Sequence, residues 1–327
     1  MLRIVCYLFI LLVFGCSLRK ERADLIVHNA VIYTLNPAQP TVEALVVKDG
    51  KIVETGAERR IMNRYQSTVI IDGKKNYVYP GFTYHEYREA SMVEVTDIFS
   101  VGATEYVVFL PDAALNMEAS NLPGFAIRYR SPVSLGKNTS RSGTYYSCEK
   151  ALDQFVWNTG TGTHVEICSD NTALLLDSLL TPITEETPDH RLGIHLRQSF
   201  FGNVNRLKEK YVIPFVSKGI LSDTAQISVS GFSMIIPVRD SPLALFTAMF
   251  QSGFSPDESL KSITVWPSIA HFAEEERGTL EPGKAGNFTM LNTDILKSPD
   301  EAANARIIYT VREGEIMHGM SPKSSNR

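Results

Sequence analysis

The fold of this chain is decided by the stretch from residue 44 to residue 53, which reads ALVVKDGKIV. Apolar runs flank Asp49 and Gly50, and an Asp-Gly pair supplies the positive φ angles that a tight type I′ turn requires. The stretch therefore predicts a β-hairpin. Runs rich in β-branched and aromatic residues at 25–33 and 68–79 have the same texture, so we expect the N-terminal region to form a sheet.

The same β texture returns near the other end of the chain. A turn at 278–283 precedes a predicted strand at 288–291, and the turn at Glu313-Gly314 separates two more, at 306–311 and 315–317. We expect residues 24–79 and 278–320 to form one small β-sandwich domain built from both chain ends.

The middle of the chain, residues 80–277, has a different character. Apolar strands such as 106–110 and 192–196 alternate with helical stretches such as 242–250. Ser255, followed by Pro256 and two acidic residues, is a typical helix start with an N-cap. Alternation of strands and helices predicts an α/β domain around a parallel sheet.

The composition is that of a globular protein. Of 327 residues, 44% are hydrophobic and 21% charged, which excludes a disordered, collagenous or coiled-coil chain. A net charge of −4 gives no basic footprint, so we expect no nucleic-acid partner. After the first fifteen residues, no apolar run reaches the roughly 20 residues that span a bilayer.

The first sixteen residues, MLRIVCYLFILLVFGC, have the pattern of a secretory signal. Arg3 precedes a short apolar run, and the ending at Gly15-Cys16 resembles a bacterial lipobox. We expect residues 1–15 to be removed, Cys16 to be lipidated, and residues 16–23 to form a tether. Ser17 then indicates the outer membrane of the cell envelope, facing the periplasm or the exterior. The alternative is an ordinary signal peptide that contains a cysteine.

Two further cysteines, Cys148 and Cys168, remain after processing. In an oxidising compartment they could form one disulfide, and two buried inert thiols are the equal alternative.

Four strings of this sequence resemble the amidohydrolase superfamily, in particular its family 3 type. They are ADLIVHNAVIYT at 23–34, EALVVKDGKIV at 43–53, YPGF at 79–82 and GTLEPGKAGNF at 278–288. The resemblance implies a (β/α)₈-type barrel with a small β-sandwich. At about 194 residues, the segment 80–273 is below the ~250 typical of such barrels, so we expect a shortened one.

The resemblance also implies one or two divalent metals at the mouth of the barrel, where they activate a water for attack on a C–N bond. Mapping the family's ligand positions onto this chain gives a mostly degenerate set, in which only one histidine is kept. These positions are Glu86, Arg88, Arg128, Glu166, His195 and Ile235. Two cations would repel a metal ion, so we expect none to bind and no other cofactor to be present.

The mapping predicts where these side chains point. Arg88 and Arg128 should project into the mouth and pair with Glu86 or Glu166. His85 is one residue out of register and should face the opposite side. His164, two residues before Glu166, should share its face, with strand-end packing as its role, and His195 should be a hydrogen-bonded structural residue.

Three functions are compatible with these residues. The first is a metal-free pseudoenzyme lipoprotein that binds a small molecule or an envelope protein at the old mouth. The second is an active hydrolase of non-peptide C–N bonds that uses Glu86, Glu166 and His195 for acid–base chemistry. The third is a structural envelope lipoprotein that uses only the fold. We rank the first above the third and the second last.

Overall fold

The structure is a computed structural model of the chain. It describes residues 20–87, 97–110, 127–130, 142–147, 162–167, 169–186, 191–196, 206–207, 212–221, 234–238 and 240–319.

A four-stranded sheet near the N-terminus contains the predicted hairpin. Its order is β6 (Lys51–Gly56), β5 (Ala44–Lys48), β2 (Leu25–His28) and β8 (Val69–Asp72). Between β5 and β6, Asp49 and Gly50 have φ angles of 51° and 74°. Both lie in the left-handed region that a type I′ turn requires, so the hairpin prediction is confirmed.

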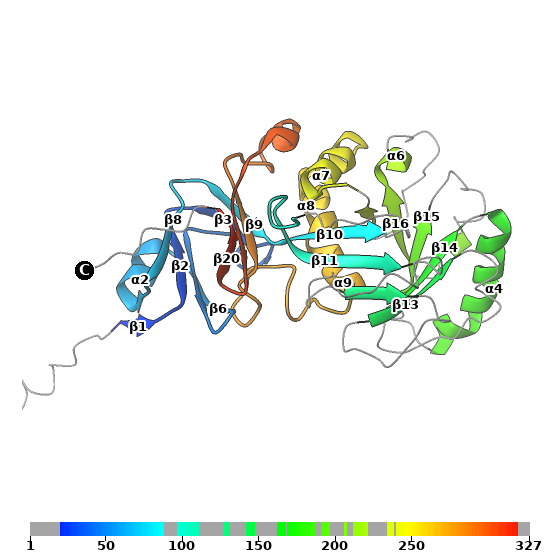
Figure 1. The fold of residues 1–327 in the computed structure, drawn as a ribbon, viewed down its shortest axis with the longest axis horizontal. Helices are drawn as coiled ribbons and strands as arrows, with labels where there is room; N and C mark the ends of the chain where they lie inside the picture. Colours follow the sequence, from blue (N-terminus) through cyan, green and yellow to red (C-terminus); the bar gives the residue numbers. More distant parts are fainter. Residues whose placement is uncertain are drawn as a thin grey trace, which may run out of the picture.

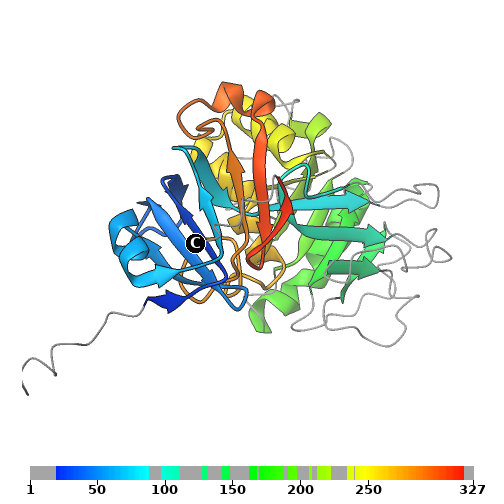
Figure 2. The ribbon, with the colours of Figure 1, turned by 60° about the vertical axis from the view of Figure 1, so that its left-hand side comes forward.

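A six-stranded sheet joins the two ends of the chain. Its order is β20 (Glu315–His318), β19 (Ile307–Arg312), β18 (Phe288–Leu291), β9 (Tyr77–Pro80), β3 (Val31–Tyr33) and β4 (Thr41–Val42). The C-terminal strand β18 pairs antiparallel with the N-terminal strand β9. Figures 1 and 2 show these blue and orange-to-red strands side by side.

The two sheets share one apolar core. Leu45 and Ile71 from the four-stranded sheet pack with Val78, Met290 and others from the six-stranded sheet. The short helix α2 (Glu58–Arg64) and a two-stranded pair, β1 (Glu21–Arg22) with β7 (Tyr65–Gln66), lie at the outer end. We refer to this region as the β part.

The middle of the chain forms an eight-stranded sheet, in which all neighbouring strands are parallel and follow in chain order. The strands are β10 (Phe82–Tyr87), β11 (Ala103–Leu110), β12 (Ile127–Arg130), β13 (Ser142–Ser147), β14 (Thr163–Ile167), β15 (Gly193–Leu196), β16 (Ile213–Ser217) and β17 (Ile236–Val238). The first and last strands approach each other, without a hydrogen-bonded ladder between their described residues. The predicted parallel α/β sheet is confirmed, and we refer to this region as the α/β part.

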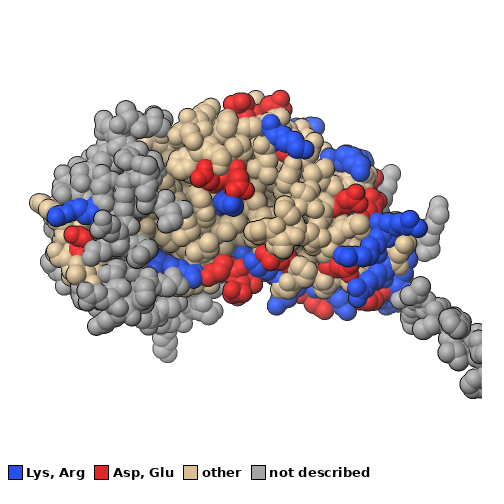
Figure 3. Space-filling model, turned by 180° about the vertical axis from the view of Figure 1, so that it is seen from behind, with Lys and Arg blue, Asp and Glu red and all other residues tan. Residues whose placement is uncertain are grey.

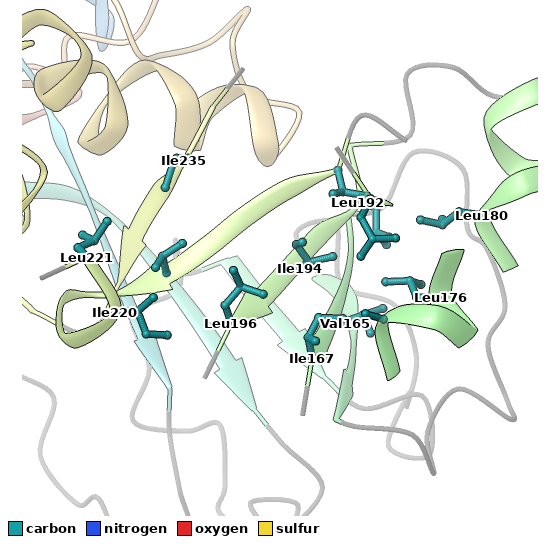
Figure 4. Packing of buried hydrophobic residues seen from close by; sticks show 14 of the residues in the cluster. Val165, Ile167, Leu176, Leu180, Leu192, Ile194, Leu196, Ile220, Leu221 and Ile235 are labelled. Atoms are coloured by element: carbon teal, nitrogen blue, oxygen red, sulfur yellow. The ribbon is translucent and has the colours of Figure 1, made fainter. Parts of the chain in front are cut away.

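The two faces of the parallel sheet pack differently. On the outer face, α4 (Asp170–Glu186) directs Leu176 and Leu180 toward Val165, Ile167 and Ile194, as Figure 4 shows. On the inner face, side chains such as Phe109, Tyr145, Phe215 and Ile236 pack together. Because side chains alternate along a strand, this packing assigns a face to every described strand residue.

The remaining helices follow the last strands. They are α6 (Lys218–Leu221), α7 (Pro242–Gln251), α8 (Pro256–Ile263), α9 (Val265–Ala270) and the 3₁₀ helix η5 (Pro299–Asn304). Leu245 of α7 and Leu260 of α8 pack with Tyr79 and Leu291 of the β part, so these helices seal the seam between the two parts. None of the helices within the described ranges is long and apolar enough to cross a membrane.

Candidate functional site

Four histidines from distant parts of the sequence meet at the inner face. His85 lies on β10, His164 on β14 and His195 on β15, and each is at most 2% exposed. His271, the residue after α9, is the fourth. His85 Nε2 lies 3.1 Å from His271 Nε2, and His164 Nδ1 lies 2.8 Å from His195 Nε2. The histidines therefore form two hydrogen-bonded pairs.

Aromatic side chains surround these pairs. The ring centre of His195 lies 4.5 Å from that of Phe109, 4.7 Å from that of Phe215 and 5.2 Å from that of Tyr145. The Tyr87 hydroxyl shares a hydrogen bond with His195 Nδ1, so both ring nitrogens of His195 are engaged. The inner face is a packed and largely apolar environment with a few polar atoms directed at one another.

Burial keeps the imidazoles of His85, His164 and His271 neutral. It lowers the pKa of His85 to about 3, because a buried cation loses its hydration. The pKa values of His164 and His271 are also well below the ordinary value, first because of burial and then because neighbouring imidazoles disfavour a second charge. A neutral ring has one N–H donor and one acceptor, which is what an imidazole–imidazole hydrogen bond needs.

The sequence provides room for His164 by placing a glycine opposite it. A Cβ atom at Gly193 would lie 2.2 Å from His164 Nδ1, far inside van der Waals contact. Gly193 and His164 are register partners on neighbouring strands. The imidazole therefore lies over a position where any larger residue would displace it.

Glu166 and His195 come together as the mapping predicted. They are register partners on β14 and β15, and both side chains are 2% exposed. Val165 and Ile167 pack on the outer face, so Glu166 must face the inner side, as must His164. A carboxyl group and an imidazole on adjacent strands form an acid–base pair in principle.

Glu86 was predicted to lie at the inner-face site, but its side chain lies on the outer face. His85 occupies the inner position instead. The Tyr106 hydroxyl donates to the Glu86 carboxylate, and Tyr106 packs on the side opposite Phe109. The reason is that the position counted from Pro80-Gly81-Phe82 is one residue too far along the strand: β10 alternates without interruption, so His85 and Tyr87 share the inner face and Glu86 lies on the other.

Ile235 is also misassigned. It immediately precedes β17 and packs in the outer cluster with α4, while Ile236 and Val238 occupy the inner positions. The predicted mouth position is therefore wrong by one residue. The residues that do face inward, Ile236 and Val238, are apolar like Ile235.

The predicted arginine network receives no support from the described residues. Arg128 lies at the register position of Val108, which is itself the partner of Glu86, and its side chain lies outside the described part. Arg88 lies outside the described residues, as do Cys16, Cys148 and Cys168.

The donor set of the inner face does not fit a metal ion. Zinc and similar ions need three or four lone pairs that converge on one point. Here the imidazole nitrogens are directed at one another in pairs, and within the described ranges no three His, Cys, Asp or Glu side chains are grouped to hold an ion.

Sequence reasoning missed three members of the cluster. His85 and Tyr87 were missed because the ligand positions were counted one residue too far along β10. His271 lies 186 residues from His85 and has no local motif, so only the folded chain reveals the contact. The sole sequence signal was the spacing of His85 and Tyr87, which places both on one face of a strand.

One family model matches a C-terminal segment of the chain that crosses from the α/β part into the β part. Residues 248–318 match the model of the amidohydrolase family. No curated protein matches the chain.

Solved structures resemble the fold over most of the chain at low identity. A molinate hydrolase is 11% identical with a TM-score of 0.60, covering 94% of this chain and 99% of its own. An enamidase is 15% identical with a TM-score of 0.58, covering 92% and 97%. An amidohydrolase from Thermotoga maritima is 13% identical with a TM-score of 0.60, covering 91% and 100%.

At these identities the structural likeness concerns the fold, which is of the TIM-barrel α/β type. The chain therefore has the fold of the amidohydrolase superfamily, and its C-terminal match to the amidohydrolase family model confirms the family resemblance predicted from its sequence.

Proposed function

We propose that this hydrolase-like chain is a pseudoenzyme that no longer performs metal-dependent hydrolysis and that binds a small molecule or an envelope protein at the former mouth of its parallel sheet. The observation that carries the proposal is the pairing of the inner-face imidazoles. His85 bonds to His271 and His164 bonds to His195, so the groups that could ligate an ion satisfy one another instead.

The other inner positions support the same conclusion. Ile236 and Val238 present only hydrocarbon from β17, where the family resemblance expects a carboxylate that moves protons. Aromatic rings from β11 and β16 fill the space around the imidazoles. A metal-bound water would require a polar, open coordination position, and these side chains supply none.

Elemental analysis of the purified mature protein tests this proposal. We expect well under one equivalent of zinc, iron, manganese or nickel after dialysis. Stoichiometric metal that survives dialysis would contradict it. To test ligand binding, thermal unfolding should be recorded with a panel of small amides, ureas and carbamates. A rise in melting temperature with one compound would identify a ligand class, and no shift would favour the structural lipoprotein.

A second candidate function is metal-free hydrolysis of non-peptide C–N bonds, which the pairing of Glu166 with His195 favours. In this mechanism one group removes a proton from water while the other donates a proton to the leaving nitrogen. Glu166→Gln and His195→Gln should each abolish hydrolysis measured in the presence of a chelator. Glu86→Gln is the matched control, because Glu86 is bonded to Tyr106 on the outer face.

The cellular setting is part of the proposal. Cleavage after residue 15 and lipidation of Cys16 would anchor the protein in the bacterial envelope, with the outer membrane as the destination. Globomycin should cause an uncleaved precursor to accumulate. Cys16→Ala should be released from the membrane or mislocalised, whereas a normally cleaved variant with unchanged fractionation would contradict the anchor.

The finer architecture also belongs to the proposal. The shared core of the two smaller sheets supports a β-sandwich made of residues 24–79 and 278–320. The eight parallel strands support a barrel over residues 80–277 that is shortened in its connecting segments. An experimental structure with closed hydrogen bonding between β10 and β17 would establish the barrel.

A further inference from the structure

The end of the molecule that carries β1 and α2 has a cluster of exposed basic side chains. This basic face consists of Lys20, Arg22, Arg59, Arg60 and Arg64. Four carboxylates, Glu21, Glu43, Glu54 and Glu58, lie among them, with Glu43 accepting from the Glu58 N–H at the start of α2. This leaves a surplus of one positive charge (five minus four), whereas the whole chain has a net charge of −4. Figure 3 shows Lys and Arg concentrated at this end, interspersed with acidic groups.

Some of the basic side chains form ion pairs, and others have N–H donors that form none. Arg60 pairs with Glu54 at 2.8 Å, and Arg64 pairs with Glu21 at 3.0 Å. Arg22 and Arg59 form no ion pair with any residue that the structure describes. Their guanidinium groups are available for a ligand with several acceptor oxygens, such as a phosphate.

The basic face is tied to the start of the described chain. Lys20 Nζ donates to the Met62 carbonyl at 2.6 Å, and β1 pairs with β7 immediately after α2. A seven-residue helix is only about 10 Å long, so the whole face lies close to Lys20.

Lys20 is four residues from Cys16. Four extended residues span at most about 14 Å. A lipid on Cys16 would therefore hold Lys20, at the edge of the basic face, within about two Debye lengths of the headgroups at physiological salt.

We propose that the basic face rests on anionic phospholipid headgroups of the membrane that holds the lipid anchor. This inference depends on the proposed lipidation of Cys16 and adds an orientation to it. Basic groups next to a membrane anchor give a second, electrostatic attachment that is lost in high salt. The α/β part, at the opposite end of the molecule in Figure 1, would then project away from the membrane with its strand ends accessible.

The test uses the mature lipidated protein with Asn63→Trp, because Asn63 is an exposed position of α2. Energy transfer from the added tryptophan to dansyl-labelled headgroups reports how close α2 lies to the bilayer, after subtraction of the signal from Trp157 and Trp266 in the protein without this substitution. The protein is placed in vesicles of phosphatidylcholine alone or with roughly a third of anionic phosphatidylglycerol.

We expect at least two-fold more energy transfer on the anionic vesicles, and loss of the difference in about 0.5 M salt, where the Debye length is short. Arg22→Glu with Arg59→Glu should also remove the difference. Arg206→Glu, an exposed arginine of the α/β part, is the matched control and should leave it unchanged. Circular dichroism checks that each variant is folded.

Two results overturn the inference, and they can be distinguished. Mass spectrometry of the same preparation reports acylation of Cys16. If Cys16 is not acylated, the anchor and the inference both fail. If Cys16 is acylated and energy transfer is equal on the two vesicle types, or insensitive to the double charge reversal, only the basic-face proposal fails.

Discussion

The β part and the α/β part treat polar groups in opposite ways. The core between the two sheets of the β part is apolar, and ion pairs such as Arg60–Glu54 lie toward its surface. The inner face of the α/β part buries imidazoles and Glu166 among aromatic rings. Burying polar groups is unfavourable unless they are hydrogen-bonded, so the α/β part depends on its polar contacts in a way that the β part does not.

The β part therefore serves mainly to stabilise the fold, whereas the α/β part contains the buried polar groups that could take part in binding or catalysis. The apolar core of the β part should respond to loss of hydrocarbon and little to pH. The α/β part should respond to changes in single polar atoms and in protonation. The seam between them is the point of greatest sensitivity, because it contains a buried ion pair.

The largest loss of unfolding free energy is expected when that ion pair is broken. Arg277 bonds to Glu105 of β11, and the two side chains are 10% and 5% exposed. Asn287, next to β18, donates to the other oxygen of Glu105 at 2.9 Å. Arg277→Met leaves a buried carboxylate with reduced compensation and should lower the unfolding free energy by about 3–5 kcal/mol.

Urea unfolding measures this loss, with Arg306→Met as the control at an exposed arginine. Adding Glu105→Leu to Arg277→Met should recover part of the stability, because the unpaired charge is then removed. An unfolding midpoint equal to the wild type for Arg277→Met would show that the pair is not buried as described.

The pH dependence of stability is the next property in which the two parts should differ. Burial lowers the pKa of His85 to about 3, so the unfolded chain takes up a proton below pH 6.5 while the folded chain does not. Stability is therefore lost as pH falls through 6.5, by about 2 kcal/mol at pH 5 for this residue. His164 and His271 act in the same direction.

The measurement is the unfolding free energy between pH 7.5 and pH 5, for the wild type and for His85→Gln. Glutamine keeps a polar group and has no proton to take up, so the variant should have a shallower pH dependence. Parallel curves for the two proteins would mean that His85 is solvated in the folded state.

How much of this could be predicted depends on the range of the interaction. The hairpin at Asp49-Gly50 and the cap at Ser255 are set by neighbouring residues, and both are found as predicted. Glu166 and His195 were also placed correctly, because strand alternation is enough to assign their faces once a strand is recognised.

The errors arose where the folded chain overrides local pattern. Glu86 and Ile235 were each placed one residue out of register, because a position counted from a motif does not establish which face of the strand it occupies. Strands β13 and β16 have weak local signals, because SGTYYS is short and polar and Pro214 interrupts the apolar run of β16. The contact between His85 and His271 joins distant segments, so no local signal predicts it.

A smaller effect is expected at Gly193, which accommodates the His164 ring. Gly193→Ala would place a methyl group against His164 Nδ1 and should lower the unfolding free energy by about 1–3 kcal/mol through overpacking. Combining it with His164→Ala should cost less than the sum of the two single changes. Gly219→Ala in α6 is the control, because no residue in the described part of the chain lies within 4 Å of its added Cβ atom. Equal stability of the Gly193→Ala and Gly219→Ala variants would contradict the close packing.

The smallest predicted effect compares two helix starts at the seam that look alike in sequence. Both α7 and α8 begin with Ser-Pro, but Ser241 makes no side-chain capping bond, whereas Ser255 Oγ accepts from Glu258 N at 3.2 Å and Ser255 N donates to the Glu258 carboxylate at 2.9 Å. Ser255→Ala should therefore lower the unfolding free energy by about 1 kcal/mol, and Ser255→Asp should restore most of it. Ser241→Ala should change the unfolding free energy by at most a few tenths of a kcal/mol, because no capping bond is lost. Urea unfolding of the three variants measures these differences. Equal losses at both serines would mean that the Ser-Pro sequence, and not the reciprocal bond to Glu258, stabilises these helices.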